Sequence, residues 1–72
     1  MITDEQARMI YELHRERGYG LDTFPATEPD DSFTLAELTT AGMVVQVEPG
    51  LMRLTHKALE AYDGWAQRRW NG

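Results

Sequence analysis

The chain has 72 residues, with twelve acidic and seven basic side chains, and a formal net charge of −5. It contains no cysteine, which excludes disulfides, thiolate metal sites and cysteine nucleophiles. A chain this short forms one domain, here residues 1–72, and buries only about 60% of its unfolded surface, too little for the enclosed pocket of an enzyme. Its composition, 42% hydrophobic and 26% charged, is typical of a folded globular protein.

The sequence predicts neither a membrane span nor a signal peptide. Its longest apolar runs, residues 9–11 and 43–45, fall far short of the roughly 20 residues that a spanning helix needs. The first residues include Asp4 and Glu5, where a signal peptide carries basic residues. We therefore expect an unprocessed cytoplasmic protein.

The first predicted element is a helix over residues 4–17. Thr3 and Gln6 have the spacing of a capping box, in which each side chain bonds the backbone N–H of the other residue. Gly18 is predicted to end the helix in the left-handed conformation. The apolar residues of the helix recur at spacings of three, namely Ala7, Ile10 and Leu13.

Residues 18–33 contain two glycines and two prolines, which predict a long loop. One of its apolar side chains, Tyr19, Leu21 or Phe24, is expected to hold the loop against the core. A second, short helix is predicted to follow.

That second helix is predicted over residues 34–41. Thr34 and Glu37 repeat the spacing of a capping box, and Phe33 is placed to contact Leu38 as a hydrophobic staple.

The carboxyl-terminal part is predicted to be a hairpin followed by a helix. Residues 43–55 alternate between apolar and polar positions, with a turn at Glu48, Pro49 and Gly50. Because a proline–glycine turn matches hairpin twist poorly, we expect a loop of more than two residues. Thr55 is the expected cap of the last helix. Its apolar face consists of Ala58, Leu59, Tyr62, Trp65 and Ala66.

Three short sequences in this order resemble a known fold. The first consists of Leu35 and Leu38 followed by residues 41–44 (Ala-Gly-Met-Val). The second is the hairpin. The third is residues 53–55 (Arg-Leu-Thr), which open a helix. The pattern resembles the second half of the winged-helix domain in MarR-like and PadR-like regulators, and is similar to small phage-associated winged-helix proteins, over about residues 33–70. The resemblance implies an α+β fold, a reduced winged helix with helix–loop–helix–β-hairpin–helix order.

A winged helix also implies a DNA-binding transcription regulator, which would use residues 34–41 and the hairpin at 46–54. Charge weighs against this alternative, because specific DNA binding typically takes about six to ten contacts from lysine and arginine to phosphates. Residues 34–41 contain one glutamate and no basic residue, and Arg53 is the only basic residue of the hairpin. Residues 1–33 hold eight acids against three bases, whereas residues 34–72 hold four of each.

The excess of acid in the first half predicts a docking surface for a basic partner. We expect a small acidic protein-binding module, a regulatory or inhibitory protein of phage or bacterial origin that occludes a basic, nucleic-acid-handling surface of another protein. A simpler interpretation is that these acids only keep the protein soluble. Trp70, near the chain end, is the predicted aromatic contact with a partner or within a homodimer. The candidate acidic residues are Glu12, Glu16, Asp22, Glu28, Asp30 and Asp31.

No catalytic, cofactor-binding or metal-binding residue is predicted. The two histidines, His14 and His56, fall on different predicted elements with no carboxylate at ligand spacing. The sequence has neither the glycine-rich loop of a phosphate site nor the glycines of a nucleophile elbow. We therefore expect a protein that is not an enzyme.

Overall fold

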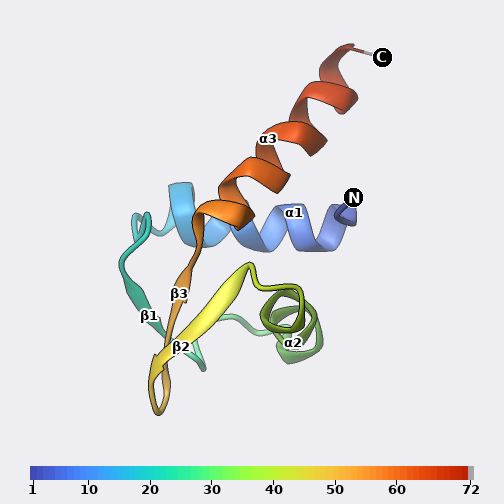
Figure 1. The fold of residues 1–72 in the computed structure, drawn as a ribbon. Coiled ribbons are helices and arrows are strands. Elements are labelled where there is room, and N and C mark those ends of the chain that lie inside the picture. The colour runs from blue at the N-terminus through green and yellow to red at the C-terminus, as the bar shows by residue number, and fades with distance from the viewer. Residues whose placement is uncertain (72) are drawn as a thin grey trace.

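The structure, a computed structural model, describes residues 1–71 and forms an α+β fold with a reduced winged-helix-like arrangement (Figure 1). Its order of helix, loop, helix, β-hairpin and helix is the predicted one. The elements are α1 (Asp4–Tyr11), the π-helical segment η1 (Glu12–Glu16), β1 (Thr23–Pro25), α2 (Ser32–Thr40), β2 (Val44–Glu48), β3 (Leu51–Leu54) and α3 (His56–Asn71).

The first helix begins as predicted and ends in a wider turn. Thr3 and Gln6 form the capping box: Gln6 N–H donates to Thr3 Oγ1 at 3.1 Å, and Thr3 N–H donates to Gln6 Oε1 at 3.0 Å. The last turn is π-helical, because the Arg17 N–H donates to the Glu12 carbonyl, five residues back, at 2.8 Å. Gly18 follows with φ of 75°, which confirms the predicted left-handed ending.

Part of the predicted loop is a strand. β1 pairs antiparallel with β3, so that Thr23 lies opposite Arg53 and Phe24 opposite Met52, and the sheet order is β1–β3–β2. Three residues are too few to show a strand pattern in the sequence, and their partners lie about 30 residues away. Phe24 is 0% exposed, which identifies it as a side chain that holds this segment to the core.

The second helix begins earlier than predicted. Asp31, not Thr34, is its N-cap: the Thr34 N–H donates to Asp31 Oδ1 at 3.0 Å and the Thr34 hydroxyl to Asp31 Oδ2 at 2.6 Å. The predicted contact of Phe33 with Leu38 is therefore wrong, and Phe33 is 73% exposed. A staple needs an apolar residue just before the cap, and that position is Asp30.

The hairpin is confirmed, although its loop is shorter than expected. β2 and β3 pair as far as Glu48 and Leu51, which leaves two residues, Pro49 and Gly50, with φ of 81° at Gly50. The register shifts between Gln46 and Glu48, so β2 carries one extra residue. Such a bulge increases the local strand twist, which allows the short proline–glycine turn to close the hairpin.

The core lies between α1, α2, the sheet and the first turn of α3. α3 continues through Gly64 without interruption, and its last turns project beyond the other elements (Figure 1). This projection makes the molecule elongated, with extents of 40 × 22 × 20 Å. None of the helices in the described part of the chain is long and apolar enough to cross a membrane. The buried apolar residues are Ile2, Ala7, Met9, Ile10, Leu13, Phe24, Leu35, Leu38, Val44, Met52, Leu54 and Ala58.

Candidate protein-interaction surfaces

A hollow of about 240 Å³ lies between the first helix and the segment that leads into α2; we call it the acidic hollow. Four carboxylates and two guanidinium groups line it, so it carries a formal net charge of −2. Met9 and Pro29 are its apolar lining residues. The charged residues that line it are Glu5, Arg8, Glu12, Arg17, Asp30 and Asp31.

The structure brings together three of the six predicted acidic residues. Glu12, Asp30 and Asp31 line the acidic hollow. Glu28 forms an ion pair with Arg17, which offsets its charge.

The other two predicted acidic residues lie elsewhere. Glu16 and Asp22 are exposed and do not line the hollow. Acidic residues that lie close together in the sequence therefore do not all belong to one acidic surface.

Asp31 has a structural role in addition to its place in the hollow. Hydrogen bonds from the Thr34 hydroxyl, and then from the Thr34 backbone N–H, hold the pKa of Asp31 below its ordinary value, because both stabilise the ionised carboxylate. The carboxylate also satisfies an N–H group that would otherwise have no partner in the first turn of α2. Asp31 therefore positions the helix that follows it.

We expect Asp31→Ala to lower the melting temperature by a few degrees, because it removes this cap. Asp30→Ala removes the same charge from the neighbouring position and should leave the melting temperature nearly unchanged. Asp31→Ser keeps an oxygen that accepts from the backbone and should restore most of the loss. Thermal unfolding followed by circular dichroism measures all three, and equal shifts for Asp30→Ala and Asp31→Ala would contradict the capping role.

The same cap makes stability depend on pH. The folded-state pKa of Asp31 is lowered, so the ionised cap contributes fully to stability above the pKa of an unfolded aspartate, about 3.9. This contribution to stability is lost as the pH falls through the folded-state pKa. The difference in stability between the native chain and Asp31→Ala should therefore narrow in acid below about pH 4.

The outward face of α2 carries an exposed aromatic side chain that sequence reasoning missed. Phe33, Ala36, Glu37 and Thr40 are exposed and follow one another at helical spacing. The Gln6 side-chain amide donates to Glu37 Oε1 at 3.3 Å, which ties this face to α1. If Asp31 is taken as the N-cap of this helix, the sequence predicts that Phe33 faces solvent.

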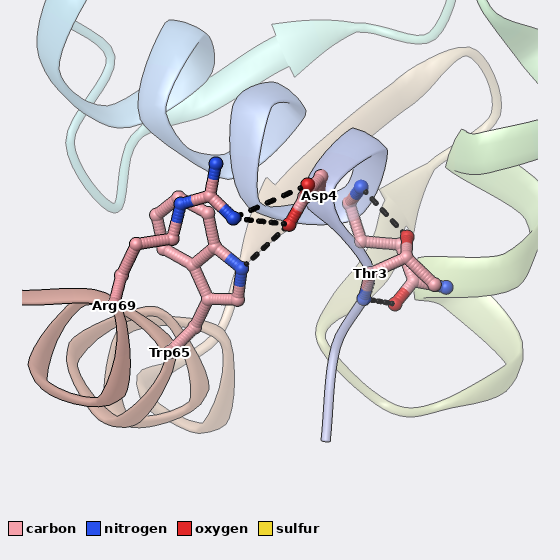
Figure 2. Close-up of polar contacts among 5 residues, drawn as sticks. Thr3, Asp4, Trp65 and Arg69 are labelled. Carbon is pink, nitrogen blue, oxygen red and sulfur yellow. Dashed lines mark hydrogen bonds and ion pairs between the residues drawn. The ribbon is translucent and has the colours of Figure 1, made fainter. Parts of the chain in front are cut away.

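Asp4 joins the start of α1 to the projecting part of α3 (Figure 2). Trp65 Nε1–H donates to Asp4 Oδ1 at 3.0 Å, and Arg69 Nη1 lies 3.4 Å from both Asp4 oxygens. The Arg69 guanidinium also lies over the Trp65 ring, 5.2 Å from its centroid, as a cation–π contact. No local sequence signal predicts this cluster, because Asp4 is more than 60 residues from both Trp65 and Arg69 in the sequence.

A groove that we call the aromatic seam runs between α1 and α3. Tyr11 of α1 stacks on Tyr62 of α3 with centroids 6.2 Å apart, and the Tyr62 ring lies 5.7 Å from that of Trp65. Two cavities, of about 90 and 300 Å³, share these two tyrosines. Trp70, the predicted partner contact, lies beyond the seam and is 86% exposed.

Within the part of the chain that the structure describes, no group of three or more histidine, aspartate or glutamate side chains could hold a metal ion. No protein-family model matches the chain, and no curated protein or solved structure matches it either.

Proposed function

We propose that this protein is a small acidic protein-binding module that docks onto a basic surface of a partner protein. The observation that carries the proposal is the convergence of Glu12, Asp30 and Asp31 in one hollow. Phe33, two residues after Asp31 in the sequence, is exposed at the start of α2. A negative surface together with an exposed aromatic side chain would combine charge complementarity with an apolar anchor.

The two parts of this surface have different tasks. The carboxylates attract a basic partner over distances of about a Debye length, 8–10 Å at physiological salt, and accelerate association. Phe33 exposes most of its ring, and burying it in an apolar pocket of the partner would slow dissociation. The proposed partner therefore presents lysine and arginine side chains around an apolar depression.

The mode of action that we propose is occlusion. A partner surface that is basic enough to hold nucleic acid would be covered by the acidic hollow, so that the module acts as a regulator or inhibitor. The face of α2, which a winged-helix regulator would present to DNA, supports a protein partner because it carries Phe33 and Glu37 and neither lysine nor arginine. The resemblance to small phage-associated winged-helix proteins is compatible with such a role.

The test is a charge reversal that spares the helix cap. We expect Glu12→Lys with Asp30→Lys to reduce capture of the partner from a lysate of the source cells by about tenfold or more, because it turns attraction into repulsion. Asp31 is left in place so that α2 keeps its cap. The effect is measured by comparing capture on the immobilised native protein with capture on the immobilised variant, followed by elution with heparin. Heparin is used because a polyanion competes for a basic partner surface.

The matched control is Glu16→Lys with Asp22→Lys, which changes the net charge by the same amount outside the hollow. Equal loss of capture in both double variants would show that net charge alone acts, and unchanged capture in the first would contradict the docking surface. Salt-sensitive binding of a labelled random DNA duplex to the native protein, measured by fluorescence anisotropy at low salt, would instead support the winged-helix regulator.

A further inference from the structure

The larger cavity of the aromatic seam, about 300 Å³, combines aromatic side chains with a carboxylate. Tyr11, Tyr62 and Trp65 supply the rings, and Asp4 supplies the carboxylate. Aromatic rings attract cations, and a carboxylate accepts hydrogen bonds from the parallel N–H groups of a guanidinium. The chemistry of this cavity therefore suits an arginine side chain. Its remaining lining residues are Ala7, Arg8 and Arg69.

The chain's own Arg69 shows that a guanidinium fits at this place. Its Nη1 lies 3.4 Å from both Asp4 oxygens, and its Cζ lies 5.2 Å from the centroid of the Trp65 ring (Figure 2). Charge-assisted hydrogen bonds are usually shorter, about 2.7–2.9 Å. The side chains of Arg69 and Asp4 are also 58% and 60% exposed, and exposed ion pairs contribute little to stability. Arg69 is therefore held weakly, and a competing guanidinium can displace it.

The carboxylate of Asp4 keeps its orientation without Arg69. The Trp65 Nε1–H donates to Asp4 Oδ1 at 3.0 Å, which fixes the carboxylate relative to the indole. Among residues 1–71, the only donor to the second oxygen, Oδ2, is Arg69. When the Arg69 side chain turns away, Oδ2 and the Trp65 ring remain in place for another guanidinium.

We propose that an arginine side chain of the basic partner enters this cavity and replaces Arg69. The inference rests on the proposed function, which supplies a partner with a basic surface, and adds a second point of contact. Arg8 lines both this cavity and the acidic hollow, so the two are neighbours on α1 and one partner surface can cover both. Arginine is expected rather than lysine, because only a guanidinium pairs with a carboxylate through two N–H groups and also stacks on a ring.

The charge of the cavity permits this exchange. Asp4, Arg8 and Arg69 give it a formal net charge of +1, and replacing one guanidinium by another leaves that charge unchanged. A free arginine competes with a side chain that is already at the site. An arginine of a docked partner is instead held nearby at a high effective concentration. The exchange therefore follows docking on the acidic hollow.

The test uses a hexa-arginine peptide as the ligand and the fluorescence of Trp65 as the readout. Trp70→Phe, at a position that is 86% exposed, leaves Trp65 as the only tryptophan. In that background, Arg69→Ala should lower the dissociation constant of hexa-arginine about threefold or more, because the peptide no longer competes with an internal guanidinium. Binding should also change the emission of Trp65, because a guanidinium then packs on its ring.

Arg68→Ala is the matched control, because it removes the same charge from a neighbouring residue that does not line the cavity. Its effect on the dissociation constant should be clearly smaller. Asp4→Asn, added to Arg69→Ala, should abolish the gain, because an amide still accepts from Trp65 but carries no charge to pair with a guanidinium. Hexalysine should gain less than hexa-arginine from Arg69→Ala. Equal gains in Arg69→Ala and Arg68→Ala, or a gain that survives Asp4→Asn, would overturn the proposal.

Failure of this inference and failure of the proposed function give different results. Glu12→Lys with Asp30→Lys should weaken hexa-arginine binding, because it reverses charge in the acidic hollow. If it does so while Arg69→Ala and Arg68→Ala behave alike, the acidic hollow stands and the arginine site is wrong. If it leaves binding unchanged while Arg69→Ala still strengthens it, the cavity binds arginine and the proposed docking surface is wrong.

Discussion

Replacing Phe24 by alanine should lower the free energy of unfolding by about 3–5 kcal/mol. Phe24 is 0% exposed and is the only buried side chain of β1, and Tyr19 packs beside it with ring centroids 6.0 Å apart. Its removal leaves a cavity and releases the segment that connects η1 to α2. Because small domains are stable by only about 5–15 kcal/mol, the variant should lose a large fraction of its stability and unfold at a much lower urea concentration. Urea denaturation followed by circular dichroism measures the change.

Phe33→Ala provides the control, since it makes the same chemical change at a position that is 73% exposed. It should alter the free energy of unfolding by no more than about 0.5 kcal/mol. If the urea midpoint of Phe24→Ala matched that of Phe33→Ala, β1 would not be docked on the core as described.

Leu38→Ala should lower the free energy of unfolding by about 2–5 kcal/mol. Leu38 is 0% exposed on the inner face of α2, opposite Phe33, and its carbonyl accepts the Met43 N–H at 2.9 Å where the helix ends. The variant should therefore loosen the helix that presents the proposed docking surface. Urea denaturation reports the overall loss, and amide hydrogen exchange reports whether α2 opens first.

Thr40→Ala, on the exposed side of the same helix, is the control and should be neutral or slightly stabilising, because alanine has the higher helix propensity. Loss of stability in Thr40→Ala comparable to that in Leu38→Ala would mean that helix propensity, and not core packing, holds α2 in place.

Several elements could be predicted from the sequence because short-range interactions determine them. The capping box of Thr3 and Gln6, the left-handed Gly18 and the hairpin at residues 43–55 all depend on residues within a few positions of one another. Such local hydrogen bonds and turn geometries act in the same way wherever the segment lies in the fold.

Errors arose where two local signals competed. Thr34 and Asp31 are both good caps, and the structure uses Asp31 while burying Thr34. That three-residue difference moved Phe33 from a predicted packing contact to the solvent. The aromatic part of the proposed docking surface was missed for this reason.

The sequence by itself determined the order of the three helices and the hairpin and the excess of acid in the first half, because these follow from composition and from contacts between near neighbours. Only the tertiary structure decided that β1 pairs with β3, that Asp4 binds Trp65, and that Glu12 lies with Asp30 while Asp22 lies apart. Contacts between distant residues depend on how the elements pack, and packing is a property of the whole core that no short segment encodes.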